Sequence, residues 1–63
     1  MTNYIIRYFE CDHLPEKLQA VSRPFEDLAN LLDNSWPDGA EKSVALRKLL
    51  ESKDAAVRAA LDA

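Results

Sequence analysis

The chain has 63 residues, with eight Lys or Arg against eleven Asp or Glu, one Cys, one His, one Gly and a net charge of −3. A chain of this length forms at most one domain and buries only about 60% of the surface that its unfolded form exposes. One Cys closes no internal disulfide, and one Cys with one His does not complete a four-ligand zinc site. Extra stabilisation must come from self-association or from very regular helix packing, so we expect a symmetric homo-oligomer without a cofactor.

Charge and hydropathy exclude several classes of protein. An acidic net charge argues against a protein that coats duplex DNA or RNA, which needs a surplus of Lys and Arg. No uncharged apolar run approaches the length of a membrane span, about 18 residues, and the first residues lack the apolar region of a signal peptide. We therefore expect a cytoplasmic protein without a membrane partner, in which Cys11 is a reduced thiol.

Residues 1–13 form an N-terminal extension in this interpretation. Within it, segment 4–9 reads YIIRYF, whose aromatic and β-branched residues predict a short extended segment or strand. Both faces are largely apolar, so we expect the segment to pack against the rest of the chain; its six residues leave a short helix open. Tyr4 and Phe9 are expected to cap a small core, whereas Tyr8 fits a core position and a ligand contact equally well.

Apolar spacing predicts a first helix over residues 14–34. Six apolar residues, separated by steps of four and three, share one stripe of that helix. They are Leu14, Leu18, Val21, Phe25, Leu28 and Leu32. Pro15 suits the first turn, and Pro24 predicts a kink because proline removes a backbone hydrogen bond. We expect the helix to end near Asn34, a residue that tolerates the left-handed conformation.

A second helix is predicted over residues 39–62, after a sequence that resembles a capping box, Asp38-Gly-Ala-Glu41. Two stripes follow it: one is Leu46, Leu50, Val57 and Leu61, and the other is Ala45, Leu49, Ala56 and Ala60. The short connection makes the two helices antiparallel neighbours. The fold class is therefore all-α, a kinked antiparallel helical hairpin in a single domain, residues 1–63. One partner helix does not cover both stripes, so the second stripe faces either another subunit or the YIIRYF segment.

The sequence offers no catalytic motif. Phosphate-binding loops and the GxSxG elbow need more than one glycine, and neither a nucleophile nor an orienting partner accompanies His13. The cluster Glu10-Cys11-Asp12-His13 holds metal-competent side chains, but consecutive residues seldom converge on one ion. We expect neither enzymatic activity nor a bound metal.

Basic residues close to aromatic ones are the better candidates for a binding site. Arg7 beside Tyr8 pairs a cation with a ring that can stack on a base. Lys53 interrupts the first stripe of the second helix, so its side chain either reaches the helix edge or points into an anion pocket between subunits. Arg58 has an aspartate four residues away on either side, the spacing of an exposed ion-pair ladder. Trp36 is expected to cover the end of the hairpin.

Two longer runs resemble a known family. The sequence HLPEKLQ, which leads into the first helix, and PDGAEKSVALRKLLESKDAAVRAAL in the second resemble small phage helical-hairpin proteins that sequester cyclic oligonucleotide signals. These are the anti-CBASS sponges, with the related Thoeris anti-defence sponges. The likeness covers residues 8–61 and includes the short matches Tyr8-x-Glu10 and Val57-Arg58-Ala59. It implies a homohexamer that binds its ligands without cleaving them.

The resemblance also implies which residues bind ligand. In the family, a cyclic dinucleotide stacks on an aromatic residue before the first helix, and its phosphates meet a basic residue within that helix. Tyr8 and Arg23 match these positions by spacing, whereas counting from residues 28–29 places the basic position on Ser22. Cyclic trinucleotides bind where subunits meet, through an arginine of the second helix that corresponds to Arg58.

The resemblance therefore implies a phage protein that lowers the free concentration of cyclic di- or trinucleotide second messengers and so blocks CBASS-type signalling. Pro24 and Lys53 depart from the pattern of the better-known members. Residues 42–58 carry five basic side chains against two acidic ones, a local surplus suited to an anionic ligand. The alternative from another class is an oligomeric helical module that binds and inhibits a host protein through an exposed helix face.

Overall fold

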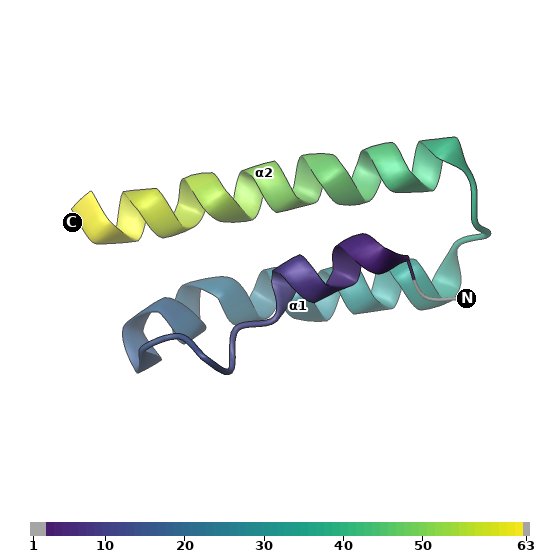
Figure 1. Ribbon diagram of the computed structural model, residues 1–63. Helices are drawn as coiled ribbons and strands as arrows, with labels where there is room; N and C mark the ends of the chain where they lie inside the picture. Colours follow the sequence, from purple (N-terminus) through teal and green to yellow (C-terminus); the bar gives the residue numbers. More distant parts are fainter. Residues whose placement is uncertain (1–2, 63) are drawn as a thin grey trace.

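The computed structural model describes residues 3–62, and its elements within that range are all helical (Figure 1). A 3₁₀-helix, η1 (Tyr4–Phe9), precedes two α-helices, α1 (Glu16–Ser35) and α2 (Ala40–Asp62). The two α-helices pack against each other as a hairpin, and η1 lies against both of them in a body of 37 × 18 × 15 Å. The all-α hairpin predicted from the apolar spacing is confirmed.

The extended form predicted for residues 4–9 is wrong, because this segment winds into a 3₁₀-helix. Asn3 caps it: the Asn3 Oδ1 atom accepts a hydrogen bond from the Ile5 N–H at 3.1 Å. Winding buries Ile5 and Phe9 together and turns Arg7 to the surface, which a strand with alternating faces does not do. A strand here also finds no partner strand within the described part of the chain, so its backbone groups would lack a ladder.

The ends of α1 differ slightly from those predicted. The helix begins at Glu16 because Leu14 still belongs to a preceding turn, and Pro15 stands before the first turn rather than inside it. It runs through Pro24 and ends at Ser35, so a kink at this proline stays a prediction. The residue after it is extended, and no residue in the described range takes the left-handed conformation expected for the helix end.

The core lies where η1, α1 and α2 meet. Its buried side chains are Ile5, Phe9, Ala29 and Leu46. Partly buried side chains pack against them: Ile6, Phe25, Leu32, Leu49 and Leu50. Leu49 belongs to the second stripe of α2, yet it joins the same core as the first stripe because η1 completes the cover. Of the two predicted covers for the second stripe, another subunit or the YIIRYF segment, the YIIRYF segment is the one that covers this half of α2.

The most buried line of α1 is displaced by one residue from the predicted apolar stripe. The buried residues of this line are Ser22, Ala29 and Asp33. Leu28, which the spacing placed in the stripe, is exposed, as is Leu31. Phe9 is buried as expected, but Tyr4 lies on the surface and is not a core residue. The hairpin therefore buries a partly polar face of α1 and leaves apolar side chains outside.

A buried ion pair joins the two α-helices near their connection. The Lys42 Nζ atom lies 3.0 Å from Asp33 Oδ1 and 2.9 Å from Asp38 Oδ1. It also donates to the carbonyls of Asp33 and Trp36, at 2.7 and 3.2 Å. Asp33 Oδ1 accepts the Asn3 N–H at 3.1 Å, which ties the start of η1 to the same carboxylate. Because a buried charge without partners is costly, this cluster specifies how the three helices meet.

Acid weakens this cluster. Burial raises the pKa of Asp33, but the Asn3 N–H and the Lys42 ammonium together lower it by more, so the pKa lies below its ordinary value. The Lys42 ammonium also lowers the pKa of Asp38. A carboxylate whose pKa is lower in the folded state than in the unfolded state stabilises the fold at any pH above the unfolded-state pKa, which is about 3.9 for Asp. This stabilisation is lost as the pH falls from there through the folded-state pKa.

The melting temperature is therefore expected to fall most steeply below about pH 4, because both carboxylates become protonated there. Replacing Asp38 by Asn removes one of the two groups and is expected to flatten this fall. Circular dichroism melts from about pH 7 down to about pH 2.5 measure both curves. Parallel curves for the wild type and Asp38→Asn would show that the Asp38 carboxylate does not contribute to the loss of stability in acid.

Lys42→Met leaves the buried Asp33 carboxylate without its cation. We expect the melting temperature at a fixed protein concentration to fall by roughly 10 °C or more, because removing one side of a buried pair strands the other charge. The matched control is Lys48→Met, since Lys48 is exposed and pairs with Glu51 at 3.7 Å. The effect of this control on the melting temperature should stay below about 2 °C. Equal effects of the two variants would contradict the structural role of Lys42.

Candidate functional site

The outer side of η1 carries a cation and an exposed ring. The Arg7 Nη2 atom donates a hydrogen bond to the Tyr8 hydroxyl at 3.1 Å, and Arg7 Cζ lies 5.1 Å from the centre of the Tyr8 ring. The bond to the hydroxyl raises the pKa of Arg7, so this guanidinium is charged at any physiological pH. Tyr8 is 48% exposed, which leaves ring surface that a flat ligand can cover.

Lys53 reaches the same place from α2. Its Nζ atom donates to the Tyr8 carbonyl at 2.8 Å, and only 13% of its side chain is exposed. In the single chain, the Lys53 ammonium thus bonds to η1 and not to solvent at the helix edge, and an anion pocket between subunits stays a prediction. It holds the C-terminal end of η1 against α2. Three predicted ligand residues, Arg7, Tyr8 and Lys53, therefore lie together, and we refer to them as the Tyr8 group.

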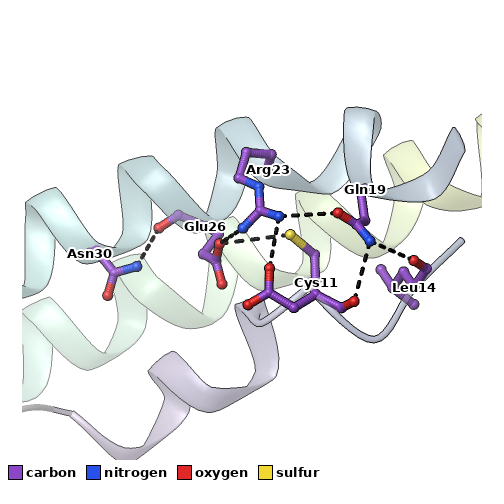
Figure 2. A network of polar contacts seen from close by, with 7 residues as sticks. Cys11, Leu14, Gln19, Arg23, Glu26 and Asn30 are labelled. Carbon is purple, nitrogen blue, oxygen red and sulfur yellow. Dashed lines mark hydrogen bonds and ion pairs between the residues drawn. The ribbon is translucent and has the colours of Figure 1, made fainter. Parts of the chain in front are cut away.

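Arg23 belongs to a second polar cluster, on α1 (Figure 2). Its Nη1 atom donates to Glu26 Oε1 at 2.6 Å, and its Nη2 atom donates to Asp12 Oδ1 at 2.8 Å. The same Nη2 atom lies 3.2 Å from Gln19 Oε1. The bonds to Asp12 and Glu26 raise the pKa of Arg23 well above its ordinary value, so this guanidinium always carries its charge. We refer to Asp12, Gln19, Arg23 and Glu26 as the Arg23 network.

Sequence reasoning missed the partners of Arg23. Gln19 and Glu26 lie four residues before and three residues after it, so helical spacing alone was sufficient to find them. Asp12 comes from the segment between η1 and α1, and no spacing rule places it there. Its position depends on how that segment folds back over the helix.

Two small polar side chains near this network are enclosed. Ser22, the other candidate for the basic position, is buried, and its Oγ atom has no hydrogen-bond partner among residues 3–62. Cys11 is a buried free thiol whose Sγ atom lies 3.7 Å from Glu26 Oε1. Burial raises the pKa of the Cys11 thiol and the Glu26 carboxylate raises it further, so the thiol stays protonated. Neither side chain is placed to meet a ligand arriving from solvent.

Arg58 lies five residues after Lys53, on an exposed part of α2. The ion pairs formed within residues 3–62 do not include it, so the ladder with the neighbouring aspartates is not formed. The side chain of Arg58 is thus open to solvent in the single chain. Trp36, expected to cover the end of the hairpin, lies at that end beside Pro37 but is itself exposed.

Across residues 3–62, no three His, Cys, Asp or Glu side chains gather in an arrangement that holds a metal ion. Neither α1 nor α2 combines the length and the apolar character that crossing a bilayer requires.

Comparison of the chain with protein-family models, curated proteins and solved structures gave no significant match. A function for this protein therefore rests on its own residues. The groups that its geometry offers to a ligand are the Tyr8 group, the Arg23 network and the open Arg58 side chain.

Lys53→Met removes the tether between α2 and the Tyr8 carbonyl. We expect the amide of Glu10, which bonds to the Arg7 carbonyl at the end of η1, to exchange with solvent roughly threefold to tenfold faster, because the helix loses a contact that holds it closed. Lys48→Met on the exposed side of α2 is the matched control. Hydrogen exchange followed by NMR makes the comparison, and unchanged protection in Lys53→Met would show that η1 does not depend on the tether.

Proposed function

We propose that this protein is a phage sponge that binds cyclic di- or trinucleotide second messengers without cleaving them. It acts as a homo-oligomer, a hexamer, in the cytoplasm of the infected bacterium and so blocks CBASS-type immune signalling. The observation that carries the proposal is the Tyr8 group, an exposed ring held at its backbone by Lys53 with the Arg7 cation beside it. A ring stacks on a base and a guanidinium pairs with a phosphate, the two parts that every cyclic nucleotide presents.

Arg23 supports a further contact to phosphate. Its side chain is 40% exposed, whereas the neighbouring Ser22 is enclosed, which favours the register counted from Tyr8. Gln19 and Glu26 hold the guanidinium in one orientation. A cation that is already oriented loses less conformational freedom when it binds, so the affinity per contact is higher.

The proposed trinucleotide site needs more than one subunit. A single Arg58 meets one phosphate, whereas copies of it around a symmetry axis meet several at once. Such symmetry also concentrates positive charge locally while each chain keeps its net charge of −3. The exposed apolar side chains of Leu28, Leu31 and Leu61 offer surface for assembly.

The same exposed apolar side chains also fit the second candidate function, a helical module that binds and inhibits a host protein. Such a module needs a continuous apolar face, whereas the sponge needs its cations and its ring gathered in one pocket. Binding of a cyclic nucleotide that depends on particular arginines therefore distinguishes the two functions.

Calorimetric titration with a panel of cyclic di- and trinucleotides, including cyclic di-AMP, cyclic di-GMP and cyclic tri-AMP, tests the proposal. We expect at least one member to bind and to be recovered intact by chromatography after the complex is denatured by heat. Degraded ligand would make the protein an enzyme. The absence of heat with every member of the panel would refute the sponge and favour the host-protein module.

The same titration with two arginine variants tests the role of Arg58, one variant being the matched control. Arg58→Ala is expected to weaken trinucleotide binding roughly 10- to 100-fold, the loss of a hydrogen bond to a charged group, with the oligomer mass unchanged in light scattering. Arg47→Ala removes the same charge from another exposed position on α2 and should change binding by less than about twofold. Equal weakening by both variants would mean that net charge matters and the position of Arg58 does not.

A further inference from the structure

Two carboxylates neutralise Arg23 in the free protein. Glu26 Oε1 lies 2.6 Å from Nη1 and Asp12 Oδ1 lies 2.8 Å from Nη2, so one positive charge faces two negative ones. A phosphate that approaches this guanidinium meets a net negative environment and finds Nη2 already bonded. Gln19 and Asp12 together use both hydrogens of Nη2, so an anion that binds the Nη2 atom has to displace one of them.

The two carboxylates differ in how firmly they are held. The Glu26 side chain is 15% exposed, lies one turn along the same helix and also receives the contact from the Cys11 thiol. The Asp12 side chain is 85% exposed and comes from the segment before α1. Exposed ion pairs between flexible side chains are weak because water competes for both charges. Asp12 is therefore the partner that leaves at low cost.

The backbone around Asp12 is held independently of its carboxylate. Gln19 Nε2 donates to the Asp12 carbonyl at 3.2 Å and to the Leu14 carbonyl at 2.8 Å, contacts that are visible around Gln19 in Figure 2. The carboxylate can rotate away about its side-chain bonds while the chain stays in place. Gln19 Oε1 and Glu26 remain on Arg23 after that rotation and keep the guanidinium oriented.

We propose that Asp12 is a displaceable internal counter-ion, which occupies on Arg23 the position that a ligand phosphate takes. This inference rests on the proposed function and adds the residue that sets how tightly Arg23 binds a phosphate. A simple anion that takes the place of the Asp12 carboxylate replaces one exposed ion pair by another, so the exchange gains little free energy. A cyclic nucleotide also presents bases and a second phosphate, and contacts made by these groups offset the cost of displacing Asp12. The cost of displacing Asp12 lowers the affinity of Arg23 for every phosphate by the same factor, so only a ligand with further contacts still binds at low concentration.

Asp12→Asn tests the inference against Asp27→Asn, which removes the same charge from an exposed position on α1. Titrated with cyclic di-AMP, Asp12→Asn is expected to bind roughly two- to fivefold more tightly than the wild type, the factor equivalent to losing one weak exposed ion pair. Asp27→Asn should differ from the wild type by less than about 1.5-fold at physiological salt. Equal affinities of the two variants would overturn the role of Asp12.

Inorganic pyrophosphate provides a readout that does not depend on cyclic nucleotides. We expect the Arg23 Nε–H signal in NMR spectra to respond at a lower pyrophosphate concentration in Asp12→Asn than in Asp27→Asn. The same response in both variants would overturn the inference even where cyclic nucleotides bind. A response enhanced in Asp12→Asn alone, with no binding of any cyclic nucleotide by the wild type, would support the counter-ion and refute the proposed function.

Discussion

The fold depends on one buried ammonium ion near the connection of the hairpin. The Lys42 Nζ atom takes oxygen partners from the end of α1 and from the connection, and Asp33, the more deeply buried of its two carboxylates, also accepts the N–H of Asn3. Three helices thus meet at a single carboxylate. A shift of α2 by one turn, about 5.4 Å, would strand both charges. The hairpin therefore closes in one register, and η1 starts from a fixed point on it.

The Tyr8 group depends on this register because η1 is held at both of its ends. Asn3 fixes the start of η1 on Asp33, and Lys53 fixes its end through the Tyr8 carbonyl. A 3₁₀-helix of this length is not stable alone, since its hydrogen bonds are few and poorly aligned. The hairpin consequently holds the backbone from which Arg7 and Tyr8 extend, and the contact between their side chains is local.

Both long helices follow from the four-and-three spacing of their apolar residues, and the hairpin follows from the short connection. The 3₁₀-helix does not, because YIIRYF has the composition of a strand and its form is decided by the Asn3 cap and by packing on two helices. From the sequence alone, Asp33 is expected on the surface, because the partner that allows its burial, Lys42, is identified only in the folded chain. Spacing and resemblance identified Tyr8 as a ligand candidate, but its contact with Lys53 spans 45 residues and exists only in the folded chain.

Lys53 and Arg58 leave α2 in different directions. An α-helix turns about 100° per residue, so five residues separate these side chains by about 140° around the axis. Lys53 faces η1, and Arg58 is thereby turned away from the Tyr8 group. Within one chain, the Tyr8 group and Arg58 therefore do not face a common ligand. In the proposed oligomer, each subunit contributes residues to both kinds of ligand site, and the amount of ligand sequestered is the sum over the two kinds.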